Sequence, residues 1–294
     1  MTRLAQVFDE LRAAGRKAVI PFVTAGDPDL ESTAKLLEAL AGIGCPILEL
    51  GIPYSDPIAD GPVIQASYTR ALDRGVRLNQ IWPMVREVTR RISSPIVIMC
   101  SMAIVHRVGV SRFFQQAIDA GACGAIIPDL LLEELPAVAE EAEKYRFPLV
   151  QLVTPTTPRP RAVQIAKASR GFLYYVSVTG ITGERQQLPV ELVQNVAWLR
   201  SQTDLPIAIG FGISSPEHVR MLAPVADGLI VGSAIVRRLE RCSAGQIDQV
   251  LPEVLGFVRS LIDAADSKSG SGAGPSDTAG AADRACSISK NTPQ

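Results

Sequence analysis

Two acidic residues, Glu49 and Asp60, lie in a stretch that is otherwise mostly apolar residues, proline and glycine. The stretch reads LELGIPYSDPIADGP over residues 48 to 62, and Glu49 interrupts the apolar pattern PILELGI. Burying a carboxylate is costly unless it is paired, hydrogen-bonded or neutralised. A desolvated carboxyl has a raised pKa, which suits it to proton transfer near neutral pH. The pattern makes Glu49 a candidate acid–base residue and Asp60 a second carboxylate for the same ligand.

A structural role for these acids is the alternative. Glu49 would then pair with an Arg or Lys, while Asp56 and Asp60 would cap turns beside proline and glycine. The pattern leaves both interpretations open for Glu49 and favours the structural one for Asp56. Asp129, which ends the apolar run GAIIPD, is interpreted as structural or interfacial.

Two glycine clusters could bind an anion. They read GFGIS over residues 210 to 214 and GSAI over residues 232 to 235, and each follows an apolar run. Glycine loops expose backbone N–H groups, and helix N-termini carry partial positive charge. Glycines that only permit tight turns are the alternative, but two clusters at consecutive strand ends favour a phosphate site. Thr182 and Gly183 lie in the polar loop from Val178 to Pro189, which we expect to form a lid.

Eight apolar runs rich in Val, Ile and Leu predict the strands that must position these residues. They span residues 18 to 24, 46 to 52, 95 to 100, 124 to 129, 148 to 154, 171 to 177, 206 to 211 and 228 to 232. Amphipathic segments between them predict crossover helices and hence parallel strands. This α/β pattern favours a closed (β/α)8 barrel, whose reactive groups gather at the C-terminal strand ends, over an open doubly wound sheet.

The last part of the chain differs in composition from the rest. From Ala264 it is rich in Gly and Ser and almost free of large apolar side chains, so it cannot bury enough surface to offset the entropy of ordering. We therefore expect one barrel domain over residues 1–263 and a disordered tail over residues 264–294.

Composition narrows the class of partner. With 29 basic and 30 acidic residues and a net charge of −1, the chain offers no broad attraction to nucleic acid or to an acidic membrane. No apolar run is long enough to span a bilayer and no signal peptide is evident, so the expected compartment is the cytosol. Five scattered cysteines without a CxxC pair argue against disulfides and zinc, and the predicted chemistry needs no metal or bound cofactor.

Several motifs together are specific enough to indicate a family. The chain resembles the tryptophan synthase alpha chain through PFVTAGDP, LELGIPYSDPIADGPVIQ, IIPDL, VSVTGITG, IGFGIS and VGSAIV, which occur in that order between residues 21 and 236. The resemblance spans about residues 3 to 262. It implies a TIM barrel and a reversible retro-aldol cleavage of indole-3-glycerol phosphate to indole and glyceraldehyde 3-phosphate.

The resemblance also assigns roles to residues. Glu49 matches the family's acid–base glutamate, and Asp60 matches the aspartate that accepts a hydrogen bond from the indole N–H. The residues that match its phosphate site are Gly183, Gly212, Gly232 and Ser233, with Thr182 beside them in the expected lid. The residues that match its pocket-lining aromatics are Phe22, Tyr174 and Phe211.

A partner protein is implied as well. The family works with a beta chain, as an alpha2beta2 tetramer, and the pyridoxal phosphate cofactor belongs to that partner. Asp56 and Pro57 match a loop that contacts the beta chain. Where the family has a tyrosine and an asparagine after the third strand, this chain has Ser101 and Ala103, which changes the pocket wall. A stand-alone indole-releasing lyase and a weakly catalytic subunit that mainly activates a beta chain are the alternative functions.

Overall fold

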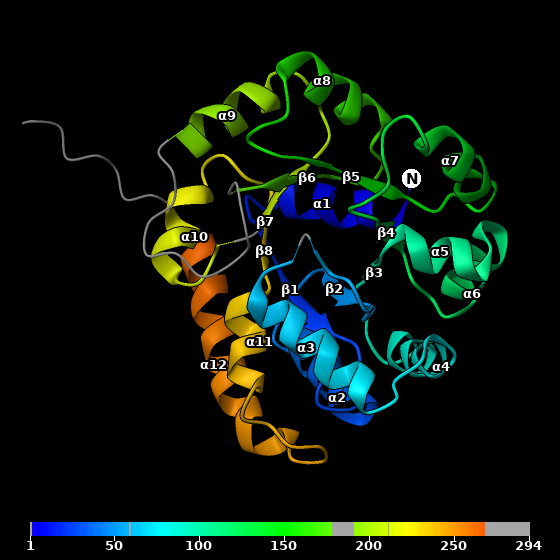
Figure 1. Ribbon diagram of the computed structural model, residues 1–294. Coiled ribbons are helices and arrows are strands. Elements are labelled where there is room, and N and C mark those ends of the chain that lie inside the picture. Colours follow the sequence, from blue (N-terminus) through cyan, green and yellow to red (C-terminus); the bar gives the residue numbers. More distant parts are fainter. Residues whose placement is uncertain (1, 59, 178–190, 211, 268–294) are drawn as a thin grey trace, which may run out of the picture.

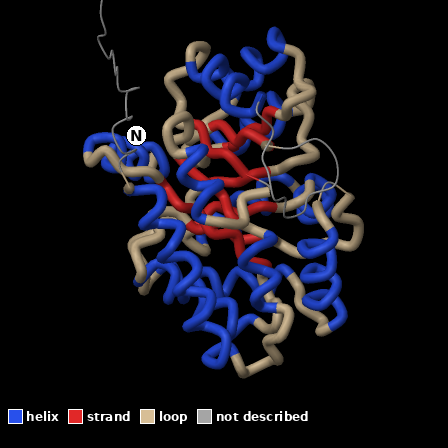
Figure 2. Tube along the Cα trace, turned by 90° about the vertical axis from the view of Figure 1, so that its left-hand side faces the viewer, coloured by secondary structure: helices blue, strands red, loops and turns tan. Residues whose placement is uncertain are grey.

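The strands close into a barrel. The computed structural model describes residues 2–58, 60–177, 191–210 and 212–267. Each strand pairs in parallel with the next, and β8 pairs with β1. Figure 1 shows helices surrounding the strands, and the turned view of Figure 2 shows the strands at the centre of the molecule. The predicted (β/α)8 barrel is confirmed, and the open sheet is excluded.

The observed strands lie within the apolar runs that predicted them. They are β1 (Ala18–Thr24), β2 (Leu48–Gly51), β3 (Ile96–Met99), β4 (Gly124–Ile126), β5 (Leu149–Val153), β6 (Leu173–Val176), β7 (Ile207–Gly210) and β8 (Gly228–Val231). Several runs begin with a proline that the strand itself leaves out, as at Pro95, Pro148 and Pro206. Proline has no N–H to donate to a neighbouring strand, so the hydrogen-bonded ladder starts after it.

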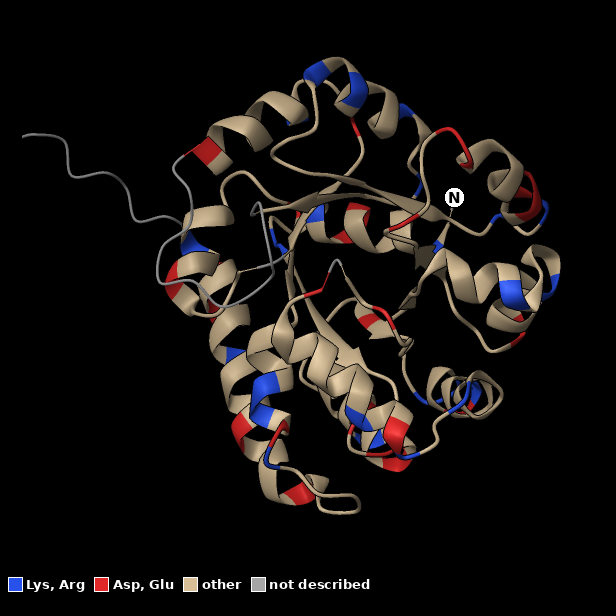
Figure 3. Cartoon of the chain, in the orientation of Figure 1, with Lys and Arg blue, Asp and Glu red and all other residues tan. Residues whose placement is uncertain are grey.

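Helices connect the strands and cover the outside of the barrel. They are α1 (Arg3–Ala13), α2 (Leu30–Gly42), α3 (Pro62–Asp73), α4 (Leu78–Thr89), α5 (Met102–Val108), α6 (Val110–Asp119), α7 (Leu135–Lys144), α8 (Arg159–Ala168), α9 (Glu191–Arg200), α10 (Pro216–Leu222), α11 (Ser233–Leu239) and α12 (Ile247–Asp266). Apart from α1, these helices contribute apolar side chains that form one large buried cluster with the outward strand side chains. Lys and Arg are interspersed with Asp and Glu along these helices (Figure 3).

A second buried cluster fills the barrel interior. Its members alternate along the strands, as Ala18, Ile20 and Phe22 do on β1. At the N-terminal end, Leu4 and Phe8 of α1 join the cluster, and the Phe8 and Phe172 ring centroids lie 5.6 Å apart. Helix α1 thus covers the N-terminal end of the barrel, which favours ligand entry at the opposite, C-terminal end of the strands.

The final helix extends into the segment expected to be the tail. α12 continues to Asp266, Ala264 and Ala265 are buried, and Arg16 forms an ion pair of 2.9 Å with Asp266. The boundary expected at Ala264 therefore comes slightly too early, because small alanines pack well on a helix face. Residues 268–294 lie outside the described residues. No helix in the described part of the chain has both the length and the apolarity needed to cross a membrane.

Candidate active site

Strand β2 places Glu49 inside the barrel. Glu49 pairs in register with Phe22 of β1 and Val97 of β3, both members of the interior cluster. Its side chain is only 1% exposed. Since alternate strand residues face the same side, Ile47, Glu49 and Gly51 point inward together, with Glu49 near the C-terminal end of the strand.

Glu49 has no positively charged partner among the residues that the structure describes. Its Oε2 atom is buried and has no hydrogen-bond partner among the described residues. Burial, together with the nearby charge of Asp60, raises the pKa of Glu49 to about 8. A buried ion pair, the structural alternative for this residue, would instead lower the pKa. The arrangement is that of a carboxyl that can both take up and release a proton near neutral pH.

Asp60 reaches the same cavity from the loop between β2 and α3. It is 3% exposed, and burial raises its pKa to about 6, although a hydrogen bond from Tyr54 works in the opposite direction. The loop is fastened by Gln65, whose amide nitrogen donates to the carbonyl oxygens of Asp60 at 2.8 Å and Pro57 at 3.1 Å. The two acids thus differ: Asp60 ionises at the lower pH and Glu49 at the higher one.

Both carboxyl groups line one cavity at the C-terminal end of the barrel. Its volume is about 460 Å³ up to the open mouth, and most of its lining is apolar, as in typical small-ligand sites. The lining residues are Phe22, Glu49, Asp60, Ile64, Met99, Tyr174, Gly212, Ile213, Ile230, Gly232 and Ser233. The cavity therefore has an acidic and aromatic side, from β1, β2 and β6, and a glycine-rich side, from the ends of β7 and β8.

The glycine-rich side is shaped by the turns after β7 and β8. Gly212 has a φ of 75°, which side-chain-bearing residues rarely adopt. The following loop is held by His218, whose Nδ1 accepts a hydrogen bond from the Ser214 N–H at 3.3 Å. After β8, Ser233 is the first residue of α11, so the cavity wall contains the start of that helix. Small residues and backbone amides here suit an anionic group.

Glycines on the strands make room for the aromatic residues. A Cβ atom on Gly51 would lie 2.4 Å from Cζ of Phe22. A Cβ atom on Gly210 would lie 2.1 Å from the Tyr174 hydroxyl oxygen. Neither distance is tolerable, so these two glycines allow the rings to lie against the backbone and leave the cavity open.

The structure brings most of the predicted site residues together. Phe22, Glu49, Asp60, Tyr174, Gly212, Gly232 and Ser233 all line the cavity. Thr182, Gly183 and Phe211, and the loop expected to form a lid over residues 178 to 189, lie outside the described residues. Asp56 is exposed and Pro57 partly exposed on the loop that also carries Asp60.

Other lining residues were not predicted as site residues. Ile64, Ile213 and Ile230 line the cavity, but an isoleucine in a strand, at a helix start or in a loop carries no signal that separates lining from core. Met99 also lines the cavity. Tyr54, which hydrogen-bonds Asp60, was also missed, although its place between the two acids was an available signal.

Ser101, which the resemblance aligns with a tyrosine, has a structural role. Its hydroxyl donates to Asp129 at 2.7 Å and accepts from the Ala103 N–H at 3.1 Å, at the start of α5. Asp129 also accepts from the Met102 N–H at 2.8 Å. The structural interpretation of Asp129 is thereby confirmed, because its carboxylate ties β4 to the N-terminus of α5. Among the described residues, no group of His, Cys, Asp or Glu is arranged to hold a metal ion.

Comparison with known proteins agrees with this geometry. A family model described as tryptophan synthase alpha chain matches residues 8–265. The tryptophan synthase alpha chain of Rhodopirellula baltica is 54% identical over 242 residues, which is 81% of this chain and 87% of that protein. That of Rippkaea orientalis is 45% identical over 262 residues, or 89% of this chain and 97% of that protein.

Solved structures extend the likeness to the fold. A tryptophan synthase structure from Mycobacterium tuberculosis superposes with a TM-score of 0.82 at 32% identity, covering 91% of this chain and 99% of that one. A chain of the tryptophan synthase complex from Pyrococcus furiosus gives 0.77 at 34% identity, covering 84% and 98%. These matches show that the chain belongs to the tryptophan synthase alpha chain family, in agreement with its motifs, its barrel and the two carboxyl groups in one cavity.

Proposed function

We propose that this chain cleaves indole-3-glycerol phosphate into indole and glyceraldehyde 3-phosphate, with Glu49 and Asp60 as its catalytic residues. Family membership supports the reaction class. The observation that carries the assignment of residues is the buried, unpaired Glu49 carboxyl, with its pKa raised to about 8, in one cavity with Asp60 and the glycine-rich turns.

Proton transfer at Glu49 is the first part of the mechanism. Its carboxylate removes the proton from the glycerol hydroxyl next to the indole. The electron pair of that O–H bond becomes the aldehyde C=O bond as the carbon–carbon bond to the ring breaks, and the pair from the broken bond returns to the indole. Before this cleavage, the ring must be protonated at C3 so that it can accept the electron pair. Protonated Glu49 helps to deliver that proton and thereby becomes the carboxylate that acts on the glycerol hydroxyl.

Asp60 acts on the ring rather than on the glycerol chain. Protonation at C3 places positive charge on the indole nitrogen, and the Asp60 carboxylate accepts a hydrogen bond from that N–H. Because Asp60 ionises near pH 6, it is charged at neutral pH while Glu49 remains able to exchange its proton. The low-dielectric cavity strengthens this stabilisation of developing charge.

The remaining lining residues would orient the substrate. Gly212, Gly232 and Ser233 would hold the phosphate from the glycine-rich side, with Thr182 and Gly183 as further proposed contacts. Phe22, Tyr174 and Phe211 would pack against the indole. Anchoring the phosphate at one side and the ring at the other fixes the scissile bond beside Glu49, so binding energy is used for alignment.

A beta chain is the proposed partner, in an alpha2beta2 assembly that uses the indole released here. Solved tryptophan synthase complexes contain chains similar to this one. Asp56 and Pro57 are the proposed contacts, and the adjacent Ile58 is 90% exposed, which favours a covered apolar side chain in a complex. Pyridoxal phosphate would belong to that partner.

An indole-release assay with and without a beta chain tests the proposal. Parent, Glu49→Gln and Asp60→Asn would be compared, with Glu87→Gln as a matched control because Glu87 is exposed on α4. We expect both site variants to lose activity and the control to keep it. High turnover of the parent alone would indicate a stand-alone lyase. An inactive parent that still binds and activates a beta chain would overturn the proposed catalysis.

A further inference from the structure

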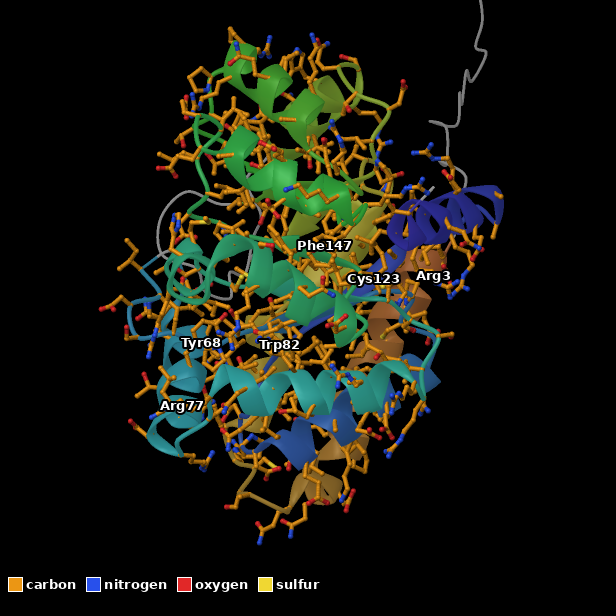
Figure 4. All side chains as sticks on the ribbon, turned by 90° about the vertical axis from the view of Figure 1, so that its right-hand side faces the viewer. Arg3, Tyr68, Arg77, Trp82, Cys123 and Phe147 are labelled. Carbon is orange, nitrogen blue, oxygen red and sulfur yellow. The ribbon has the colours of Figure 1, made fainter. Side chains whose placement is uncertain are left out.

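Tyr68 is a buried tyrosine whose hydroxyl has no partner. It lies on α3 (labelled in Figure 4) and is 1% exposed. The hydroxyl oxygen is one of three buried side-chain polar atoms without a hydrogen-bond partner in the described part of the chain. Buried polar groups are nearly always hydrogen-bonded, so one that is not requires an explanation.

The location of that hydroxyl connects it with the catalytic strand. A Cβ atom on Gly51 would lie 2.7 Å from the Tyr68 oxygen. Gly51 is two residues after Glu49 and faces the same side of β2. The Tyr68 hydroxyl therefore lies over the inner face of the strand, one step from the side chain of Glu49. Tyr68 does not line the ligand cavity itself, so it cannot act by touching substrate.

A second tyrosine shows what such a hydroxyl does here. The Tyr54 and Tyr68 ring centroids are 5.5 Å apart, and Tyr54 donates its hydrogen bond to Asp60. Asp60 thus already has a phenolic donor. Oε2 of Glu49, in contrast, is a buried acceptor without a donor among the described residues. One unpartnered donor and one unpartnered acceptor therefore adjoin the same inner face of β2.

We propose that Tyr68 is a positioning residue that donates a hydrogen bond to Glu49 when that carboxyl ionises, so that each catalytic acid is served by its own tyrosine. The expected effect of this hydrogen bond on catalysis rests on the proposed function, whereas the hydrogen bond itself does not. An ionised carboxylate in this site has no other described donor on Oε2. The bond would stabilise the charged form and hold the carboxylate in the orientation from which it removes a proton.

The neighbouring titratable groups leave Tyr68 in the role of donor. Asp60 and Tyr54 from the loop before α3, Cys100 from the end of β3 and Tyr174 from β6 face the two groups. Burial is the main cause that raises the pKa of Tyr68 well above its usual range, and the charges of Asp60, Tyr54 and Glu49 raise it further. Burial chiefly raises the pKa values of Cys100 and Tyr174 as well. Tyr68 therefore keeps its proton at every pH at which Glu49 titrates.

The experiment compares Tyr68→Phe with Tyr175→Phe. The first change removes the hydroxyl while keeping the ring that contacts Tyr54. The control removes a hydroxyl from another buried tyrosine, which bonds Asn195 on the helix side of the barrel. The primary measurement is the pKa of Glu49 by ¹³C NMR of protein labelled at glutamate Cδ, with Glu49→Gln to assign the signal. It needs no substrate and no activity.

We expect Tyr68→Phe to raise the Glu49 pKa by about one unit above that of the parent, because the variant lacks the donor that stabilises the charged form. The pH profile of kcat for indole release should shift by the same amount, with KM changed less than about twofold. Tyr175→Phe should move neither. Because the Tyr68 hydroxyl has no partner before ionisation, Tyr68→Phe should not lower the melting temperature at pH 5.

An unchanged Glu49 pKa in Tyr68→Phe would overturn the proposal, and so would an equal shift in Tyr175→Phe. A parent protein without indole release would refute the proposed function alone, because the titration still reports on the hydrogen bond. A lower melting temperature of Tyr68→Phe without any shift of the Glu49 pKa would assign Tyr68 a purely structural role, and this result would also overturn the proposal.

Discussion

Glu49 pairs in register with Phe22 across β1 and β2, so a carboxyl and an aromatic ring lie side by side on the inner wall of the barrel. The ring helps to exclude water, and Gly51 gives it the space to do so. Desolvation by such neighbours is the main cause of the raised pKa of Glu49. The chemistry of the site therefore depends on packing as much as on the carboxyl itself.

Replacement of Glu49 by Gln should abolish proton transfer while preserving shape. We expect turnover for indole release to fall by about a hundredfold or more. Binding of glyceraldehyde 3-phosphate should change little, because the glycine-rich side is untouched. Steady-state kinetics and calorimetric titration measure the two effects. Turnover in Glu49→Gln equal to that of the parent would refute the catalytic role.

The stability of the protein should depend on pH through Glu49. Its pKa is about 8 in the folded protein against an ordinary value of 4.5, so between these values the folded state binds more protons than the unfolded state. The free energy of unfolding must then fall as pH rises from about 4.5 to 8, by no more than about 5 kcal/mol. Urea unfolding at a series of pH values should show this fall, and Glu49→Gln should remove much of it.

Gly51→Ala should damage the site sterically. The new methyl would lie 2.4 Å from the Phe22 ring, and moving that ring into the cavity would misalign the substrate. We expect a loss of about 1–3 kcal/mol in stability and of at least tenfold in kcat/KM. Gly256→Ala is the matched control, since the added methyl on α12 would have no described atom within 4 Å apart from its chain neighbours and the adjacent helix backbone. Parent-like kinetics in Gly51→Ala would show that the ring has room to move.

The ion pair between Arg70 and Asp27 should be important for stability. Asp27 is 3% exposed and accepts two hydrogen bonds from Arg70, at 2.9 Å and 2.6 Å. Arg70→Ala leaves a buried carboxylate with weaker compensation from Arg74, 3.8 Å away. We expect a loss of about 2–4 kcal/mol, measured by urea unfolding.

The matched control for that pair is Arg90→Ala. Arg90 pairs with Glu87 at 3.4 Å, with both side chains more than half exposed, and such pairs contribute less than about 1 kcal/mol. Equal losses in the two variants would show that burial of Asp27 does not determine the strength of its ion pair.

The sequence alone predicted the barrel and most of its cavity. A strand that is buried on both faces has a continuous apolar run as its local sequence pattern. Eight such runs separated by helical segments therefore predict parallel strands, and the structure has eight in a closed barrel. Motif spacing placed Glu49 and Asp60 at a strand end and in the following loop, and the structure shows both in the cavity.

Only the tertiary structure decided how these residues behave. Whether Glu49 is paired depends on groups from β1, β3, β6 and α3, which are distant in sequence. The Tyr54 hydroxyl reaches Asp60 and the Tyr68 hydroxyl reaches Gly51 on the inner face of β2, because of the path of the loop before α3 and of α3 itself, which periodicity does not specify. Residue types are local information, whereas desolvation and hydrogen-bond partnership arise from the surrounding fold.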